Sequence, residues 1–295
     1  MNYNSFIELQ DKLHTNICRY LIVNVRKRTL VAIGTHDLDT IQGPFSYEAR
    51  VPDDLKFIPL NQTTEMTGTQ LMEFYKADRK LNKFLGIISH APRFPIIYDA
   101  NRQVLSLPPI INSNHSKIKM STKNVLIECT ATDLNKANIV LNTIVTMFGQ
   151  YCSQKFKVEP MEITYSDGSK VITPDLKMRK VTANVDYINN TIGIKASPLE
   201  LCSLVGKMSC SAVLSEDSKN LIVTVPPTRS DVLQECDVME DAAIAYNFNK
   251  IIETTPKLNT IALQMPINKL ADMIRQEIAF AGYTEALAFT LVPFT

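Results

Sequence analysis

The sequence predicts an α+β fold, in which short strands and amphipathic helices follow one another irregularly over 295 residues. Apolar residues recur every three to four positions over 134–148, which is typical of a helix that covers a sheet. Short β-branched runs such as 125–129 lie between polar turns, which is typical of strands. Hydrophobic residues make up 45% of the chain, and this content excludes a disordered or collagen-like protein.

The first 173 residues are interpreted as an N-terminal helix followed by a domain with a mixed sheet. The N-terminal helix is expected to present Phe6, Leu9, Leu13 and Ile17 on one face. In the domain, Ser166-Asp-Gly168 separates two strand-like runs and predicts a hairpin over 161–173. The other expected strands are 29–34, 45–51, 96–98, 104–107 and 125–129, and the expected helices are 67–88 and 134–148.

A second, smaller α+β unit is expected to begin near Pro174. Its clearest local signal is Ser197-Pro-Leu-Glu200, which places a serine cap, a proline and a glutamate where a helix starts. Strands are predicted over 212–214 and 221–225, then a helix over 236–246. A further helix over 267–281 and a strand over 286–292 are expected at the end, with no visible partner for the apolar face of the last element.

Charge and cysteine usage limit the possible compartments and partners. The net charge is +1, so overall charge alone gives no sign of nucleic-acid or membrane binding. No apolar stretch approaches the length of about 20 residues that a membrane span needs, and the N-terminus lacks the features of a secretory signal. The six cysteines show no C-x-x-C spacing and are expected to be buried, reduced thiols: Cys18, Cys129, Cys152, Cys202, Cys210 and Cys236. We therefore expect a cytoplasmic protein.

The densest charged pattern lies between Asp231 and Asp241. On a helix, Asp237, Glu240 and Asp241 share one stripe, while Val238, Ala242 and Ala245 occupy a separate, inward-facing sector. Asp231, six residues before Asp237, lies in a turn from which it can reach the same place. A hard divalent cation such as Mg²⁺ would relieve the repulsion between these carboxylates. The alternative interpretation is a solvated acidic helix face.

The loop that follows the expected strand 104–107 is the second candidate site. Two prolines stiffen it, and it carries Asn112, Asn114, His115 and Ser116. These side chains have donors and acceptors in fixed directions, so they can orient a water molecule or hold polar groups of a ligand. The alternative is a proline-stiffened turn whose side chains cap nearby backbone groups.

A third candidate combines His36, Asp37 and Asp39, which are possible metal ligands in a turn after a strand. No second histidine lies at a spacing typical of zinc sites, so an ordinary turn is the preferred interpretation. The chain also contains no P-loop, no dinucleotide-binding glycine pattern and no other motif typical of an ATP site.

Five segments of the chain carry a resemblance to a known family. They are GTHDLDT (34–40), VLSLPPIINSNHSKI (104–118), IECTATD (127–133), VPPTRSDVLQECDVMEDAAIAY (225–246) and GYTEAL (282–287). In this order they resemble the β subunit of cytosolic eukaryotic phenylalanyl-tRNA synthetases, and the resemblance covers essentially the whole chain.

The resemblance implies a ligase of two α and two β subunits that attaches phenylalanine to tRNA(Phe) with ATP and Mg²⁺. The α subunit carries ATP and the catalytic chemistry, which agrees with the lack of an ATP motif here. The implied domains are an N-terminal helix and linker (1–30), a proofreading domain (31–173), the fifth β-subunit module (174–251), and the truncated start of a class II synthetase-like domain (252–295).

The resemblance also assigns site residues. A proofreading domain must bind the extra hydroxyl of tyrosine, which a phenylalanine-selective site cannot fully reject. The matching loop offers Ser106, Asn112 and His115 for this hydrolysis of mischarged Tyr-tRNA. In the fifth module, the Mg²⁺ ligands of the family match Asp231, Asp237, Glu240 and Asp241.

The chain departs from the family pattern at three places. Tyr20–Val25 looks like an insertion or a gene-model artefact, the chain starts at an internal position of the family, and it stops just inside the synthetase-like domain. We therefore expect a central fragment that is inactive in aminoacylation on its own. Two alternatives to a ligase subunit are a non-catalytic interaction fragment that cannot assemble with α, and a free-standing hydrolase of mischarged tRNA.

Overall fold

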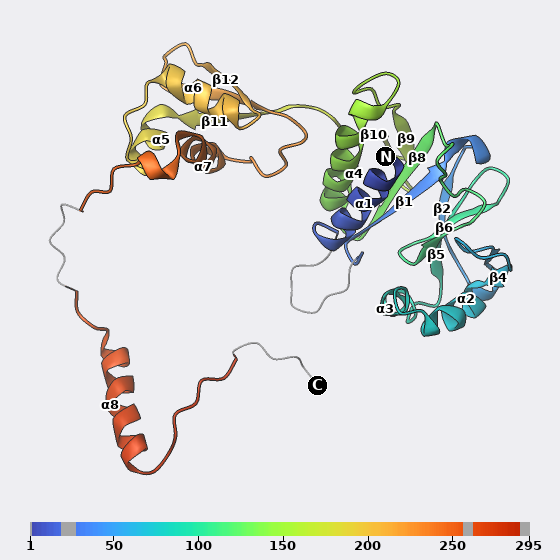
Figure 1. Cartoon of the computed structure of the whole chain (residues 1–295), viewed down its shortest axis with the longest axis horizontal. Helices are drawn as coiled ribbons and strands as arrows, with labels where there is room; N and C mark the ends of the chain where they lie inside the picture. Colours follow the sequence, from blue (N-terminus) through green and yellow to red (C-terminus); the bar gives the residue numbers. More distant parts are fainter. Residues whose placement is uncertain (1, 19–27, 256–261, 290–295) are drawn as a thin grey trace. The chain divides into compact units, whose positions relative to one another are not determined.

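The computed structural model describes residues 2–18, 28–255 and 262–289 (Figure 1). The chain divides into two units, residues 1–251 and 252–295. The larger unit contains an N-terminal domain, residues 2–173, and a C-terminal module, residues 179–251. The domain and the module each contain helices and strands, so the predicted α+β class is confirmed. The expected insertion Tyr20–Val25 lies outside the described residues.

A two-stranded sheet covered by two helices forms one layer of the N-terminal domain (Figure 1). Strands β1 (Val31–Asp37) and β8 (Val125–Ala131) pair antiparallel. Helices α1 (Asn2–Thr15) and α4 (Leu134–Phe148) pack against this pair and against each other. Both helices lie where their apolar spacing predicts them, because that spacing turns one face of each helix toward β1 and β8.

A four-stranded sheet forms the second layer of this domain, with the strand order β2-β5-β6-β7. Its strands are β2 (Ser46–Arg50), β5 (Phe94–Tyr98), β6 (Val104–Leu107) and β7 (Ile111–Asn112). The prediction of a mixed sheet is wrong for the described strands, since each of their pairings is antiparallel. Short turns connect β5, β6 and β7, and such turns join antiparallel neighbours only.

The helix expected over 67–88 is interrupted. The segment forms α2 (Gly68–Phe74), a 3₁₀ turn η3 (Tyr75–Ala77) and α3 (Asn82–Leu85). The Asp78 carboxylate accepts hydrogen bonds from the backbone N–H groups of Lys80 and Leu81, at 2.7 and 2.8 Å. This local side-chain bonding competes with helical bonding and breaks the helix.

The remaining elements of the N-terminal domain are short. The predicted hairpin is present as β9 (Met161–Thr164) and β10 (Lys170–Thr173), with Gly168 at φ 82° in the turn. A second small pair is formed by β3 (Lys56–Phe57) and β4 (Met66–Thr67). The other 3₁₀ turns are η1 (Leu38–Thr40), η2 (Pro52–Asp54) and η4 (Gly149–Tyr151).

The C-terminal module packs three helices on a three-stranded antiparallel sheet of order β11-β13-β12. Helix α6 (Pro198–Lys207) starts at the predicted cap, where Ser197 and Glu200 form a capping box. The strands are β11 (Arg179–Asn184), β12 (Ser211–Leu214) and β13 (Asn220–Val225), and the other helices are α5 (Val185–Ile192), α7 (Glu235–Tyr246) and the 3₁₀ turn η5 (Phe248–Lys250). The sequence did not predict β11 and α5, which follow each other without a loop.

The smaller unit contains α8 (Pro266–Phe280), as predicted. Residues 286–289 form no strand, and the rest of the expected strand lies outside the described residues. The large apolar side chains of α8 are exposed. None of the helices in the described part of the chain combines the length and apolar character required to cross a bilayer.

The cysteines are free thiols, as expected. Cys18 and Cys210 are buried, and burial raises the pKa of Cys18 to about 12. Cys152 and Cys236 are exposed, so the expectation that the thiols are buried is wrong for these two.

Candidate functional site

Strand β1 is buried on both faces, and its two faces differ in chemistry. Val31 and Ile33 belong to the core that α1 and α4 cover. Because side chains alternate along a strand, Gly34 and His36 face the opposite way. Glu128 on β8 is paired with Gly34 in the register of the two strands, so it shares this second face. A polar cluster therefore lies on the side of β1 and β8 that is turned away from the helices.

The cluster consists of His36, Ser106, Ser116 and Glu128, and is called the Glu128 cluster below. Ser106 Oγ donates to Glu128 Oε1 at 2.6 Å. His36 Nε2 lies 3.6 Å from the same oxygen, and His36 Nδ1 is 2.8 Å from Ser116 Oγ. His36 and Ser116 are 0% exposed and Ser106 is 1% exposed, while the Glu128 side chain is 14% exposed. One carboxylate thus connects the two sheets of the domain.

Part of this cluster has no partner. Glu128 Oε2 and His36 Nε2 are buried, and neither makes a hydrogen bond with any described residue. An unsatisfied buried polar atom costs about 1–3 kcal/mol. A ligand that brings a hydrogen-bond donor to Glu128 Oε2 would remove this cost, which makes the cluster chemically suited to bind a hydroxyl or ammonium group.

Gly34 is needed for this geometry. A Cβ atom at position 34 would overlap the carboxylate and Cγ of Glu128. The side chain of Glu128 therefore folds across the backbone of β1 to reach Ser106, and only glycine leaves room for it.

Of the three predicted proofreading residues, the structure brings two together. Ser106 is in the Glu128 cluster, and Asn112 is its partner in the register of β6 and β7. Asn112 Nδ2 donates to the carbonyl oxygen of Thr35 at 3.4 Å, beside His36. His115 makes a different contact: its Nδ1 is 3.0 Å from Ser113 Oγ, and burial lowers its pKa.

The turn that contains Asp37 and Asp39 is an ordinary one, as preferred above. Asp37 accepts hydrogen bonds from Thr122 Oγ1 and from the backbone of Asp39, at 2.6 and 3.2 Å, and Asp39 accepts one from Asn124. His36 points into the domain interior instead. Glu128 is a site residue that was not predicted from the sequence, although a carboxylate within the apolar run of 125–129 is a visible signal.

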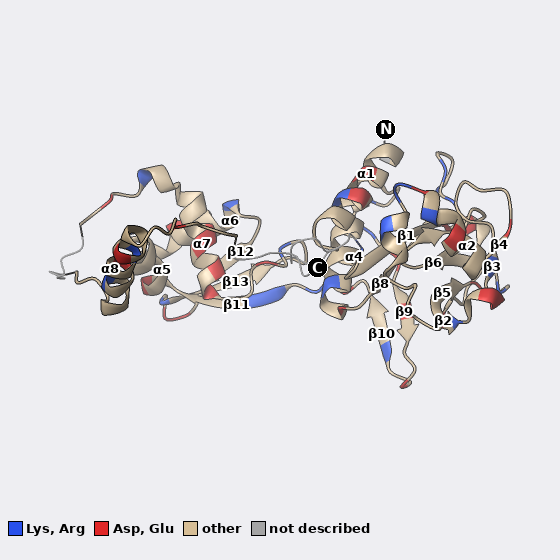
Figure 2. Ribbon diagram, turned by 90° about the horizontal axis from the view of Figure 1, so that it is seen from below, with Lys and Arg blue, Asp and Glu red and all other residues tan. Residues whose placement is uncertain are grey.

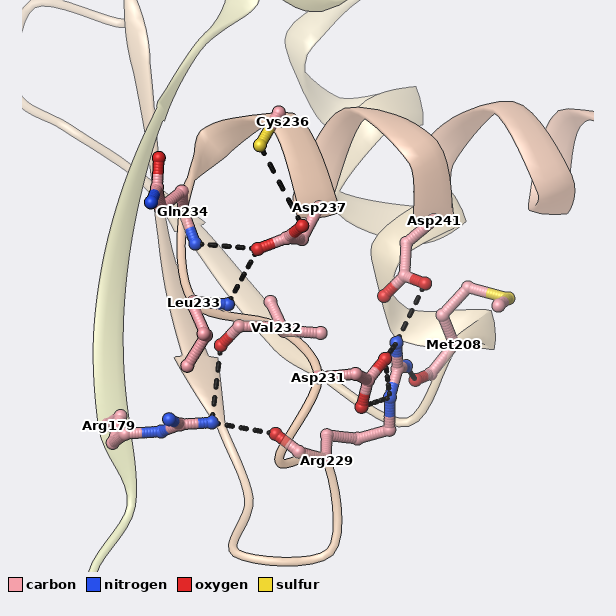
Figure 3. A network of polar contacts seen from close by, with 10 residues as sticks. All are labelled: Arg179, Met208, Arg229, Asp231, Val232, Leu233, Gln234, Cys236, Asp237 and Asp241. Carbon is pink, nitrogen blue, oxygen red and sulfur yellow. Dashed lines mark hydrogen bonds and ion pairs between the residues drawn. The ribbon is translucent and has the colours of Figure 1, made fainter. Parts of the chain in front are cut away.

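The second candidate site lies in the C-terminal module and is built around one arginine (Figure 3). Arg229 donates to both carboxylate oxygens of Asp231, from Nε at 3.0 and 3.2 Å and from Nη2 at 2.7 Å. Nη2 also donates to Asp241 Oδ1 at 2.8 Å, and Nη1 donates to the carbonyl oxygen of Met208. These residues are called the Arg229 network. Asp231 precedes α7 and Asp241 lies within it, so the arginine ties the loop to the helix.

The other acidic residues of the stripe have different surroundings. Asp237 Oδ2 accepts hydrogen bonds from the backbone N–H groups of Leu233 and Gln234, both at 2.8 Å, and these bonds hold its pKa below the usual range. The Arg229 guanidinium likewise lowers the pKa of Asp231. Glu240 is exposed, whereas Asp241 is only 5% exposed.

The apolar and the acidic residues of α7 have different surroundings. Val238 and Ala242 are buried in the core of the module and Ala245 packs against it, which confirms the inward-facing sector. The four predicted Mg²⁺ ligands, in contrast, do not converge. Two of them contact Arg229, one caps the helix and one faces solvent, and the described residues contain no group of three His, Cys, Asp or Glu side chains that could hold a metal ion. This arrangement does not fit Mg²⁺.

Comparison with known families defines the class of protein. Residues 1–153 match the model of the B3/4 domain, and residues 181–248 match that of the tRNA synthetase B5 domain. These ranges coincide with the parts that hold the Glu128 cluster and the Arg229 network. The fold and both matches define a synthetase chain that combines a B3/4 domain with a B5 domain.

Known proteins with this combination identify the family. The chain is 54% identical over 290 residues to the phenylalanine–tRNA ligase β subunit of Drosophila melanogaster and 50% identical over 289 residues to that of Homo sapiens. It also resembles the crystal structure of an N-terminal fragment of the phenylalanyl-tRNA synthetase β subunit from Pyrococcus horikoshii, with a TM-score of 0.74 and 30% identity over 84% of this chain and 67% of that one. The chain belongs to the phenylalanine–tRNA ligase β-subunit family.

The matches cover a larger share of this chain than of the relatives. Each of these two relatives matches 98% of this chain, but the match covers only 48% of the relative. The chain thus spans about half the length of the curated relatives. A relative from Arabidopsis thaliana, 52% identical over 292 residues, is described as cytoplasmic.

Proposed function

We propose that this chain acts in the cytoplasm as part of the β subunit of a phenylalanine–tRNA ligase. In this proposal it assembles with the α subunit, two copies of each, and the α subunit binds ATP and charges tRNA(Phe). The support is the family membership and the matches to β subunits over 98% of the chain. The predicted class II synthetase-like start at 252–295 belongs to the same proposal.

We further propose that the B3/4 domain hydrolyses mischarged Tyr-tRNA, and that Glu128 recognises the tyrosine. The observation that supports this is Glu128 Oε2, which is buried and has no hydrogen-bond partner among the described residues. Tyrosine differs from phenylalanine by one hydroxyl, which can donate to this oxygen. Phenylalanine would leave it unpaired, and a buried polar group left unpaired gives strong discrimination.

The neighbouring residues have separate roles in this proposal. Ser106 donates to Glu128 Oε1 and so holds the carboxylate in an orientation that leaves Oε2 available to a ligand. Asn112 and His115, which belong to the proline-stiffened loop, line the approach to the aminoacyl bond. The resemblance nominates these two residues, and their half-buried side chains are compatible with contact to a ligand.

The experiment compares Glu128→Gln with Glu162→Gln, the same substitution at an exposed position of the β9–β10 hairpin. Each variant is co-expressed with the α subunit, and the purified complex is tested for deacylation of Tyr-tRNA(Phe). We expect Glu128→Gln to lower this rate about 100-fold, because a donor replaces an acceptor at the tyrosine hydroxyl. Glu162→Gln should match the wild type. Equal deacylation by both variants would contradict the role of Glu128.

The same preparation distinguishes the alternatives. Co-purification with α and aminoacylation of tRNA(Phe) support the ligase-subunit proposal. A folded chain that does not bind α would instead be a non-catalytic interaction fragment. Deacylation of Tyr-tRNA by the chain without α would favour a free-standing hydrolase.

A further inference from the structure

In the Arg229 network, a guanidinium group lies among the carboxylates of the B5 domain. Asp231 and Asp241 are both single carboxylates, and both contact the guanidinium of Arg229.

 Their difference is burial: the side chain of Asp241 is 7% exposed and that of Asp231 is 64% exposed. The arginine side chain between them is 18% exposed. The Arg229 guanidinium thus forms ion pairs with a buried and an exposed carboxylate at the same time.

All three nitrogens of the Arg229 guanidinium are used (Figure 3). Nε and Nη2 hold Asp231 from two sides, Nη2 reaches Asp241, and Nη1 reaches the carbonyl oxygen of Met208 at the end of α6. The planar fork of arginine fits this set of acceptors, and a spherical ion does not. Mg²⁺ has octahedral geometry and keeps several of its waters, for which the space beside the buried Asp241 would have to open.

The backbone of the same loop is fixed by a second arginine. Arg179, on β11, donates from Nη2 to the carbonyl oxygens of Arg229 and Val232, at 2.8 and 3.2 Å. Figure 2 shows the basic start of β11 and the acidic positions on α7 that belong to this part of the module. The loop therefore holds Arg229 in place independently of the carboxylates.

We propose that Arg229 is the resident cation of this cluster, and that a divalent cation and the Arg229 guanidinium exclude each other there. The carboxylates of Asp231 and Asp241 cannot contact both at once, because each would place a second positive charge within a few ångströms of the first. In the wild-type module the acidic cluster is thus a structural ion-pair network. This inference does not depend on the proposed proofreading activity.

The test measures the binding of Mn²⁺, used as the probe for a divalent cation, to the whole chain by electron paramagnetic resonance. We expect the wild type to leave Mn²⁺ free, and Arg229→Gln to bind it at least about tenfold more tightly, because the competing charge is gone. The double variant Arg229→Gln/Asp241→Asn should lose this gain. The matched control is Arg275→Gln, which removes an exposed arginine that also contacts two carboxylates, Asp272 and Glu285.

Two outcomes would overturn the inference. One is tight Mn²⁺ binding by the wild type that Asp241→Asn abolishes, and the other is a folded Arg229→Gln variant that binds Mn²⁺ no better than the wild type. If Arg229→Gln does not fold, the melting temperature of the wild type decides. A cation that binds the native cluster must raise that temperature, whereas we expect no difference between Mg²⁺ and EDTA.

Discussion

The B3/4 and B5 domains each contain a partly buried carboxylate, but the two carboxylates are in opposite states. In the Arg229 network, Asp241 faces a guanidinium that also binds Asp231 and a backbone carbonyl. In the Glu128 cluster, one oxygen of Glu128 accepts a hydrogen bond from Ser106, and the other is buried without a partner among the described residues. The first carboxylate is paired with a guanidinium, whereas the second keeps one oxygen that no described residue pairs.

This difference separates a structural polar group from one available to a ligand. Satisfied buried polar groups hold elements in place, and here they join a loop to α7. A buried acceptor without a partner costs free energy in the unliganded protein, and a ligand that pairs with it recovers that free energy. Pairing, more than the number of carboxylates, therefore indicates where a ligand binds in this chain.

The largest expected effect on stability is that of Asp241→Asn. The substitution removes the buried partner of Arg229, and we expect the free energy of unfolding to fall by about 3 kcal/mol, as for other broken buried ion pairs. Urea unfolding measures it, with Glu240→Gln as the control at the exposed neighbouring position of α7. A loss as small as that of the control, within about 0.5 kcal/mol, would show that the ion pair is not structural.

The second effect is that of Gly34→Ala. The new Cβ displaces the Glu128 side chain, so we expect a loss of about 1–3 kcal/mol in stability, typical of overpacking. Deacylation of Tyr-tRNA by the complex should fall together with stability. The variant Ala32→Gly, on the same strand, serves as a control for the change in backbone propensity. Normal deacylation by Gly34→Ala would show that the position of Glu128 does not matter.

A smaller effect is expected for Ser106→Ala, which removes the donor to Glu128 Oε1. One hydrogen bond to a charged group contributes about 1.5–3 kcal/mol to stability. Because Glu128 is partly exposed, water can replace part of this bond in the variant, and we expect the free energy of unfolding to fall by about 1 kcal/mol. Thermal unfolding measures it, and Ser121→Ala is the control at an exposed serine of the same domain. An increase in stability would indicate that Ser106 and Glu128 are not paired in solution.

The smallest expected effect is a difference in stability between the B3/4 and B5 domains in mildly acidic solution. Burial holds the pKa of His115 below its value of 6.5 in the unfolded chain. The unfolded state therefore takes up the proton first, and the stability from neutral His115 is present above pH 6.5 and lost as the pH falls below it. The B5 match contains no histidine.

Hydrogen exchange followed by mass spectrometry at pH 7 and pH 5.5 would show this difference. We expect protection to decrease in the B3/4 domain and to persist in the B5 domain, where the lowered pKa values of Asp231 and Asp237 keep both carboxylates ionised. His115→Gln should reduce the change in the B3/4 domain. Equal loss of protection in both domains would contradict the role of His115.

The sequence was sufficient to predict the elements whose signals are local. The apolar spacing of 134–148, the cap at Ser197 and the stripe of carboxylates on α7 all depend on residues within a few positions of one another. The break at Asp78 was missed, because a side chain that bonds to the backbone two and three residues later leaves the apolar period unchanged.

The candidate sites were harder to predict, since their partners are distant in sequence. Glu128 meets Gly34 only because β1 pairs with β8, across more than 90 residues of intervening chain. The helix that carries Asp237, Glu240 and Asp241 was predicted, but the contact of Asp241 with Arg229, which approaches from the preceding loop, was not. Periodicity shows on which face of a helix or strand a residue lies, but it does not show which residues of other elements contact that face.

The close approach of Glu128 to Gly34 has a consequence for how this family varies. Two positions that share one small volume cannot change independently. A lineage that acquires a side chain at position 34 must accept a shorter or redirected residue at position 128. We therefore expect these two positions to covary among β subunits. Under the proposed role of Glu128, departures from the glycine–glutamate pair would mark proteins whose proofreading has changed or been lost.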